Sequence, residues 1–213
     1  LGGKVIFACR SEARARAAMR RVLVRTGDAR VCEDQLVFLP LDLSSLRSVR
    51  SCAGLFQQLG MDLHVLVLNA GVSMGNAFHD LHQRNASLAV ARKLTDVNYL
   101  GSVGVLDAVL PLLLSSRSGV RVAVVSSLAG IFPTPFRSLY SGSKFALHGF
   151  FETLRMELRD LAPPGGSVVT LLVPGLVNTE INKHRAAQNE RTLNNDMSIA
   201  VPVHDAVVRM VEG

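Results

Sequence analysis

The sequence predicts an α/β fold built on a doubly wound parallel sheet with helices on both faces. Three observations lead to this prediction. Short, almost continuously apolar runs alternate with longer segments of helical spacing along the chain. The runs lack the polar alternation of half-exposed strands, which is typical of strands buried on both faces. Polar residues or glycines follow each run, as expected where a parallel sheet binds ligands at the carboxyl ends of its strands.

Five apolar runs are the expected strands, and four segments between them are the expected helices. The strands are residues 4–9, 36–39, 63–68, 120–125 and 168–173. The helices are residues 12–25, 46–59, about 85–114 and 140–161. Ser44 or Ser45 is the expected N-cap of the second helix, since a serine hydroxyl accepts from the unpaired amides there. A Pro-Pro-Gly-Gly sequence at 163–166 ends the fourth helix before the last strand.

Composition favours one domain of ordinary size. Residues 1–213 contain no internal repeat or linker that would divide them. The net charge of +6 comes largely from arginines between Arg10 and Arg30. We interpret these arginines as a solvated helix face, because no nucleic-acid-binding motif surrounds them. A nucleic-acid partner is therefore not expected.

Two further segments have a structural interpretation. Residues 103–114 form the longest apolar stretch, but Asp107 and Pro111 interrupt it, so we expect a buried helix rather than a membrane span. His79 and His82 are expected in an exposed loop. No metal site is expected there, since no cluster of carboxylates or cysteines accompanies the two histidines.

Tyr140 and Lys144 are the candidate catalytic pair. Four positions apart on one helix, they lie on the same face, where the ammonium can stabilise an ionised phenol. A phenol has a reference pKa of about 10, and lowering it by about 3 units requires about 4 kcal/mol of differential stabilisation. Ser127, at the end of an apolar run, offers a hydroxyl that can hold a substrate oxygen. These side chains favour chemistry on a carbonyl or an alcohol.

Seven motifs occur in order over about 170 residues, and on them the chain resembles the short-chain dehydrogenase/reductase family, whose fold is Rossmann-like. Within the family, residues 126–130 and 136–151 are most similar to the hydroxysteroid- and retinol-dehydrogenase-like branch. The motifs are Ala8-Cys9-Arg10-Ser11, Leu41-Asp42-Leu43-Ser44, Asn69-Ala70-Gly71, Val97-Asn98-Tyr99-Leu100-Gly101, Ser126-Ser127-Leu128-Ala129-Gly130, Tyr140-Ser141-Gly142-Ser143-Lys144 and Pro174-Gly175-Leu176-Val177-Asn178-Thr179.

The resemblance implies a role for each catalytic candidate. Tyr140 would move the proton on oxygen, and Lys144 would also hold the nicotinamide ribose hydroxyls. Ser127 corresponds to the family's second serine, which orients the substrate oxygen; alternatively, a serine at a strand end caps a turn. Asn98 corresponds to the asparagine that anchors a water in the proton relay. The alternative for Asn98 is a buried amide that satisfies helix backbone.

Arg10 and Ser11 determine the cofactor that we expect. In the family, an acidic residue after the second strand accepts from the adenosine ribose 2′-hydroxyl. Neither Asp nor Glu stands at this point of the chain, and a guanidinium beside a hydroxyl suits a 2′-phosphate instead. We therefore expect NADP(H) rather than NAD(H). The alternative is that Arg10 is only the first charge of the basic helix.

Three further segments are implied cofactor contacts. Asp42 would accept from the adenine amino group and Leu43 would offer backbone contact, although Asp42 also fits a helix cap. A segment of small residues would let the backbone pass close to the adenosine ribose. The segment from Pro174 to Thr179 would cover the nicotinamide, and Thr179 would reach its carboxamide. These two segments comprise Asn69, Ala70 and Gly71, and Pro174, Gly175, Val177 and Thr179.

The chain departs from the family pattern at its ends. The family's first strand and glycine-rich turn, which place a pyrophosphate at a helix N-terminus, would precede Gly2. The last residues read as a helix near Val211 rather than as the family's closing strand. The fold is therefore expected to be N-terminally truncated and the domain incomplete at both ends. A sheet without its first strand exposes the edges of the neighbouring strands, which favours pairing with a partner.

Two functions from different classes follow. The first is an NADP(H)-dependent oxidoreductase that interconverts a carbonyl and a primary or secondary alcohol on a lipophilic substrate. It is expected to be a homodimer, because the Tyr140 helix carries more apolar surface than one contact stripe requires. The second is a catalytically inactive fragment or pseudoenzyme that acts as an interaction protein. The expected compartment is the cytoplasm or the endoplasmic reticulum surface, with any membrane anchor outside this chain.

Overall fold

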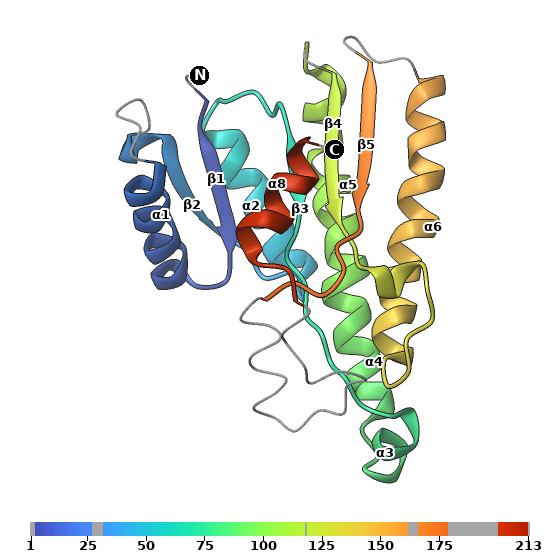
Figure 1. Cartoon of the computed structure of the whole chain (residues 1–213). Helices are drawn as coiled ribbons and strands as arrows, with labels where there is room; N and C mark the ends of the chain where they lie inside the picture. The colour runs from blue at the N-terminus through green and yellow to red at the C-terminus, as the bar shows by residue number, and fades with distance from the viewer. Residues whose placement is uncertain (1–2, 27–31, 118, 162–165, 179–199, 213) are drawn as a thin grey trace.

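The strands run parallel in two separate sheets (Figure 1). The computed structural model describes residues 3–26, 32–117, 119–161, 166–178 and 200–212. One sheet pairs β1 (Val5–Cys9) with β2 (Leu36–Pro40). The other has the order β3-β4-β5 and comprises β3 (Leu66–Leu68), β4 (Val120–Val125) and β5 (Ser167–Leu172). The pairing is parallel in both sheets, which confirms the predicted α/β class.

Helices connect the strands. Ser45 caps the helix after β2, since its hydroxyl accepts from the amide of Ser48. A continuous helical stretch with a π-helical turn in its middle leads from β3 to β4. The helices are α1 (Glu12–Thr26), α2 (Leu46–Gln58), α3 (Phe78–Gln83), α4 (Ser87–Thr95), the π-helical turn (Asp96–Leu100), α5 (Gly101–Ser115), α6 (Ser138–Asp160) and α8 (Val203–Glu212), with 3-10 turns η1 (Glu33–Gln35) and η3 (Leu128–Gly130).

α3 corrects one prediction. The sequence predicts an exposed loop around His79 and His82. Both residues are exposed, as predicted, but both lie in α3, so the prediction of a loop is wrong. Leu81 of α3 is buried in a cluster with Val90 and Leu94 of α4. Burial of this one leucine gives the segment a reason to fold as a helix that its polar composition does not show.

Among the described residues, β1 and β3 each have one edge that pairs with no other strand. In the view of Figure 1, these are the strands of the two sheets that lie nearest to each other, with α8 drawn in front of the space between them. Val5 of β1 and Val67 of β3 are 53% and 58% exposed, unlike β4, in which Val120 and Val124 are fully buried. The exposed valines agree with a parallel sheet that lacks one central strand.

α5 holds the two sheets together. Three of its side chains, Val105, Ala108 and Leu112, pack against the core of the three-stranded sheet and also against the cluster under β1 and β2. At Gly101, the first residue of α5, a Cβ atom would lie 2.6 Å from the carbonyl oxygen of Leu43. The absence of a side chain at this position therefore allows α5 to approach the chain that follows β2.

The helical stretch Ser87–Ser115 is longer than its apolar segment at residues 103–114. The stretch is long enough to cross a membrane, and an 18-residue window within it, 33% of which is buried inside the protein, has a mean hydropathy of 1.7. Leu94 and Leu113 have no exposed surface, and both belong to core clusters. Because the core helix of a soluble protein meets the same criteria, this stretch does not by itself assign a membrane.

The close approach of α5 makes Gly101 sensitive to substitution. We expect Gly101→Ala to lower the free energy of unfolding by about 1–3 kcal/mol, since the new methyl meets backbone oxygens that cannot rotate away. Gly149→Ala in α6 is the matched control, because no heavy atom lies within 4 Å of that Cβ position, and it should raise the same free energy by up to about 1 kcal/mol. Urea unfolding measures both, and equal effects would contradict the packing described for α5.

Candidate functional site

Tyr140 and Lys144 lie one turn apart on α6, and both are buried, with 9% and 5% of their surface exposed. The ammonium of Lys144 donates to the carbonyl oxygen of Val125, the last residue of β4, at 3.0 Å. Burial lowers the pKa of Lys144 from 10.5 to about 8. A lysine that is partly neutral near physiological pH, beside a phenol, is suited to proton exchange.

Ser127 lies beside this pair. It follows β4 and caps η3, its hydroxyl oxygen accepting from the amide of Ala129 at 3.2 Å. Ala129 is in the same buried cluster as Tyr140, so η3 packs against the start of α6. The turn-capping role that the sequence also allows is therefore present. Since this bond uses the oxygen as an acceptor, the hydroxyl proton is compatible with donation to a substrate.

Asn98 connects three segments of the site. It lies in the π-helical turn, is 1% exposed, and accepts from the amide of Val72 at 2.8 Å. Its own amide donates to the carbonyl oxygen of Val72 at 2.9 Å and to the hydroxyl of Ser143 at 3.0 Å. The Ser143 hydroxyl donates in turn to the carbonyl oxygen of Tyr140 at 2.7 Å. The side chain of Asn98 thus hydrogen-bonds to the segment after β3 and to α6, and not to its own helix. π-helical turns are frequent at functional positions.

Gly71 lies next to Asn98 and Lys144. A Cβ atom there would lie 3.1 Å from Oδ1 of Asn98 and 3.7 Å from Nζ of Lys144. Asn69 and Ala70, which precede it after β3, are exposed. A backbone without a side chain, next to a buried ammonium, fits the ribose of a dinucleotide, to which backbone must pass close.

The predicted adenosine residues form a second group, at the ends of β1 and β2. Hydrogen bonds from the hydroxyl and amide of Ser44, at 2.7 and 2.9 Å, lower the pKa of Asp42, and the charge of Arg10 lowers it further. Arg10 is exposed, whereas Ser11 accepts from the amide of Arg14 at 3.4 Å and so caps α1. Leu43 packs against α5.

The segment after β5 lies against the turn that carries Ser127. The carbonyl oxygen of Pro174 accepts from the amide of Leu128 at 3.0 Å, and a Cβ atom on Gly175 would be 3.3 Å from the Leu128 side chain. Val177 forms an isolated parallel bridge with Val201. Thr179 lies outside the described residues. The structure thus brings Pro174 and Gly175 next to the turn that carries Ser127, whereas no described contact links Arg10 or Asp42 to Tyr140.

Sequence reasoning did not assign roles to four residues of the site. Val72 and Ser143 are the partners of Asn98, and Arg137 joins Tyr140 to Ser73. Arg137 immediately precedes α6 and stands three residues before Tyr140, and a cation so close to the candidate proton donor is a signal that could have identified it. The contacts of Val72 and Ser73 with Asn98 and Arg137 depend on the fold and have no local signal.

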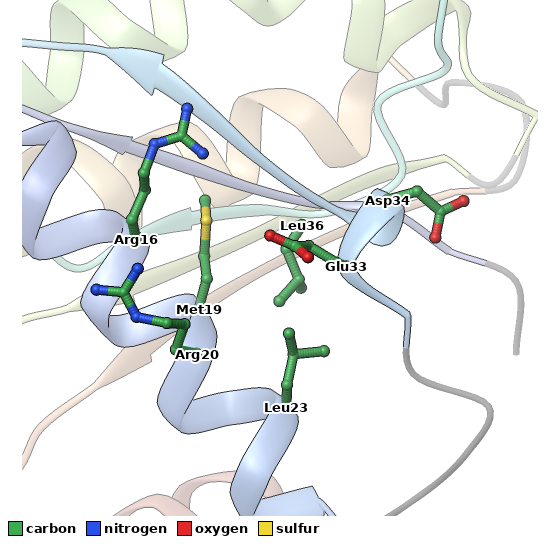
Figure 2. A pocket seen from close by; sticks show the side chains of 7 residues that line it. All are labelled: Arg16, Met19, Arg20, Leu23, Glu33, Asp34 and Leu36. Atoms are coloured by element: carbon green, nitrogen blue, oxygen red, sulfur yellow. The ribbon is translucent and has the colours of Figure 1, made fainter.

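No described cavity coincides with this site. A pocket of about 260 Å³ lies between α1 and the chain before β2 (Figure 2), and none of the predicted site residues lines it. Its walls mix arginines, acidic residues and apolar side chains: Arg16, Met19, Arg20, Leu23, Glu33, Asp34 and Leu36. Within the described ranges, no group of three or more His, Cys, Asp or Glu residues is placed to hold a metal ion. The buried polar groups around Tyr140 are the better candidate site, because they converge from four segments.

Fold and site together define a Rossmann-like α/β protein with a buried polar site at the carboxyl ends of β3 and β4. A family model described as short chain dehydrogenase matches residues 1–190. The chain therefore belongs to the short chain dehydrogenase family, as the motifs of the sequence predict.

Comparisons with individual proteins agree with this family. The chain is 34% identical over 166 residues to dehydrogenase/reductase SDR family member 7 of Homo sapiens, covering 77% of this chain and 46% of that protein. It is 37% identical over 145 residues to retinol dehydrogenase 8 of Bos taurus, covering 68% and 43%. The chain thus spans about half the length of the curated relatives that it matches.

Solved structures share the fold at low sequence identity. An alcohol dehydrogenase from the archaeon Thermococcus sibiricus, complexed with 5-hydroxy-NADP, has a TM-score of 0.74 at 20% identity, covering 99% of this chain and 80% of that one. A short chain dehydrogenase/reductase from Burkholderia phymatum, in complex with NAD, has a TM-score of 0.70 at 22% identity, covering 98% and 68%. Superposition over almost the whole chain supports the Rossmann-like arrangement of the strands and helices.

Burial of Lys144 should make stability depend on pH. The pKa is lower in the folded chain (about 8) than the unfolded value of 10.5, so the unfolded state binds more protons between these values and stability rises as pH increases through that range. At pH 7, Lys144→Met should raise the free energy of unfolding by about 1–3 kcal/mol, since the charged form no longer has to be buried.

Denaturant unfolding at several pH values measures this effect. The advantage of Lys144→Met should shrink as pH rises from 8 to 10.5. Lys93→Met, which removes an exposed lysine of α4, is the control and should change stability little. A constant difference between Lys144→Met and the parent chain at all pH values would contradict the burial of a charged ammonium.

Proposed function

We propose that this chain is the catalytic part of an NADP(H)-dependent oxidoreductase that interconverts a carbonyl and a primary or secondary alcohol. The proposal rests on one observation. Tyr140 and Lys144 of α6, Ser127 after β4 and Asn98 of the π-helical turn come from three segments and converge in one polar group at the carboxyl ends of β3 and β4. When bound, the nicotinamide supplies or accepts the hydride.

The side chains divide the remaining work. In the reducing direction, the Tyr140 hydroxyl donates its proton to the carbonyl oxygen as that oxygen becomes an alcohol. Lys144 lies one turn away and stabilises negative charge on the phenol. Ser127 donates a hydrogen bond to the same substrate oxygen and orients it. Asn98 holds the Gly71 segment against α6, so that the ribose and the proton donor have a fixed separation.

The preference for NADP(H) rests on Arg10. Its guanidinium is exposed after β1, and no carboxylate stands at Cys9 or Ser11 to repel a 2′-phosphate. The charge of Arg10 contributes to lowering the pKa of Asp42, and this agrees with a common role of the two side chains in binding adenosine. The solved structures with similar folds include complexes with NAD and with NADP, which leaves this preference to the residues of the chain itself.

A lipophilic substrate is supported by the surface next to Ser127. Leu128, Ile131 and Phe132 follow it and are 46%, 43% and 63% exposed. Contiguous exposed apolar side chains beside a polar site are typical of a surface that binds an apolar ligand. Retinol dehydrogenase 8 is among the relatives, and a retinoid or steroid carbonyl fits such a surface.

A homodimer is supported by the outer face of α6. Phe145 and Met156 are 43% and 59% exposed there, and Leu88 of α4 is 76% exposed. Large apolar side chains at helical spacing favour packing against a second helix pair. The compartment proposed for the protein is the cytoplasm or the endoplasmic reticulum surface, with any anchor outside this chain.

A second candidate function is that of a catalytically inactive interaction protein. The unpaired edges of β1 and β3 favour it, because their backbone groups are available to a strand from a partner. The enzyme proposal and this alternative differ in one property that can be measured directly, namely binding of NADPH.

Replacing the proposed proton donor separates chemistry from binding. Tyr140→Phe should lower kcat by about 100-fold or more, since the general acid is lost. The Kd for NADPH should change by less than about threefold, because one hydroxyl is removed from a much larger contact. The assay measures the loss of NADPH absorbance in the presence of a panel of lipophilic aldehydes and ketones. It uses a form of the chain that has measurable turnover. Full activity in the variant would overturn the assignment of Tyr140.

Titration with NADPH, followed by its fluorescence, distinguishes the two functions. The chain alone and the chain extended upstream by a strand and a glycine-rich turn are compared. Micromolar binding by either form supports the enzyme, and binding only by the extended form assigns the pyrophosphate site to the added segment. Arg10→Ala should weaken NADPH at least about tenfold and NADH much less. Failure of both forms to bind supports the interaction protein.

A further inference from the structure

Arg137 links the start of α6 to the segment after β3. Its Cζ lies 5.3 Å from the centre of the Tyr140 ring, within the range of a cation–π contact. Its Nη1 donates to the hydroxyl of Ser73 at 3.1 Å, across a sequence separation of 64 residues. One guanidinium thus contacts both the proposed proton donor and the chain two residues beyond Gly71.

The backbone before Arg137 is held in an unusual conformation. Phe136 has a φ of +63°, in the left-handed region that bulky residues rarely adopt. Arg137 itself is anchored on both sides, since its amide donates to the carbonyl oxygen of Thr134 at 3.2 Å and its carbonyl accepts from the amide of Ser141 at 2.7 Å. A non-glycine residue persists in such a conformation only where its surroundings fix it, and these positions cluster at functional sites. The strained turn delivers Arg137 to the ring of Tyr140.

The segment after β3 is held from a second direction by Asn98. Both backbone groups of Val72 bond to the amide of Asn98, and the next residue, Ser73, bonds to Arg137. Two consecutive residues are therefore tied to the two helices that carry Asn98 and Tyr140. Gly71, which adjoins them, cannot move without disturbing these contacts.

We propose that Arg137 is a positioning residue that locks the Gly71–Ser73 segment onto Tyr140, so that the cofactor-lining backbone and the proton donor move as one unit. The roles of Gly71 and Tyr140 in this unit rest on the proposed function, whereas the clamp itself (Arg137 with Ser73 and Tyr140) does not. A planar guanidinium suits this place because it stacks on a ring with its face and donates from its edge at the same time. A lysine does only one of these well.

Hydrogen exchange of the backbone amides at residues 72–76 tests the clamp in the full chain. Arg137→Met and Ser73→Ala should each accelerate exchange about fivefold, the effect of one lost hydrogen bond on a local opening. The double variant should exchange no faster than either single variant, since both remove the same bond. Arg137→Lys should fall between the parent chain and Arg137→Met.

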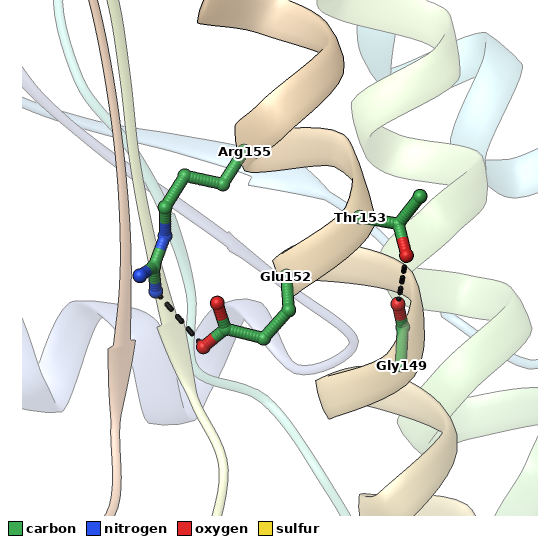
Figure 3. Close-up of polar contacts among 4 residues, drawn as sticks. All are labelled: Gly149, Glu152, Thr153 and Arg155. Carbon is green, nitrogen blue, oxygen red and sulfur yellow. Dashed lines mark hydrogen bonds and ion pairs between the residues drawn. The ribbon is translucent and has the colours of Figure 1, made fainter.

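Arg155→Met is the matched control. Arg155 lies on α6, fifteen residues after Tyr140, and pairs with Glu152 at 3.0 Å (Figure 3). It should leave exchange at residues 72–76 unchanged. Unchanged exchange in Arg137→Met, or equal acceleration in Arg155→Met, would overturn the proposal, because the segment would then not depend on the clamp.

A spectroscopic signature reports on the ring itself. The chain has two tyrosines and no tryptophan, so in a Tyr99→Phe background the near-UV circular dichroism of tyrosine comes from Tyr140 alone. Arg137→Met should weaken this band and Arg155→Met should not. A band of the same strength in both variants would show that the guanidinium does not order the ring.

Turnover separates this inference from the proposed function. In a form of the protein that turns over, Arg137→Met should lower kcat about tenfold with a smaller change in the KM for NADPH, since alignment rather than affinity is lost. Arg137→Lys should recover part of kcat. Absence of turnover in the parent protein would reject the proposed function, and the exchange and dichroism results would then decide whether Arg137 acts as a clamp. An unaltered kcat in Arg137→Met would reject the inference alone.

Discussion

The amide of Asn98 is the interaction on which the site depends. It is almost fully buried, and its three hydrogen bonds join the π-helical turn, the segment after β3 and α6. A buried polar group is costly unless all its partners are in place, and leaving one unsatisfied costs about 1–3 kcal/mol. The network therefore tolerates one arrangement of these segments, and that arrangement positions Tyr140, Lys144 and Gly71 together.

The same helical stretch also explains how a divided sheet remains ordered. α5 begins directly after the turn that carries Asn98, and Val105, Ala108 and Leu112 pack on both hydrophobic clusters. Packing of one helix against both sheets joins them, although β1 and β3 are not hydrogen-bonded to each other. This packing fixes one face of the sheets, whereas the strand edges keep their exposed valines. The adenosine group on β1 and β2 is thereby connected to the catalytic group through α5 and not through the sheet.

The sequence predicted the features that have a local signal. Buried parallel strands appear as continuous apolar runs, and Tyr140 and Lys144 share a helix face by their spacing alone, so fold class and catalytic helix follow from short segments. The site residues at strand ends follow from topology, because parallel strands bring their carboxyl ends to one edge. What escaped prediction depends on distant pairs. Ser73 meets Arg137 across 64 residues, and the buried Leu81 that makes α3 a helix has its partners in α4.

The burial of Lys144 is unfavourable for stability, so stability alone does not explain the site. Its ammonium is buried with a carbonyl oxygen as hydrogen-bond partner, and no ion pair accompanies it within the described ranges. Burial therefore lowers its pKa to about 8 and makes the charged form unfavourable, which a folded protein without a use for the charge would avoid. Gly71 packs close to the same nitrogen, since a Cβ atom there would lie 3.7 Å from it and 3.1 Å from Oδ1 of Asn98. A buried cation that lowers stability, next to a backbone position with no room for a side chain, is more easily explained by a functional role than by folding.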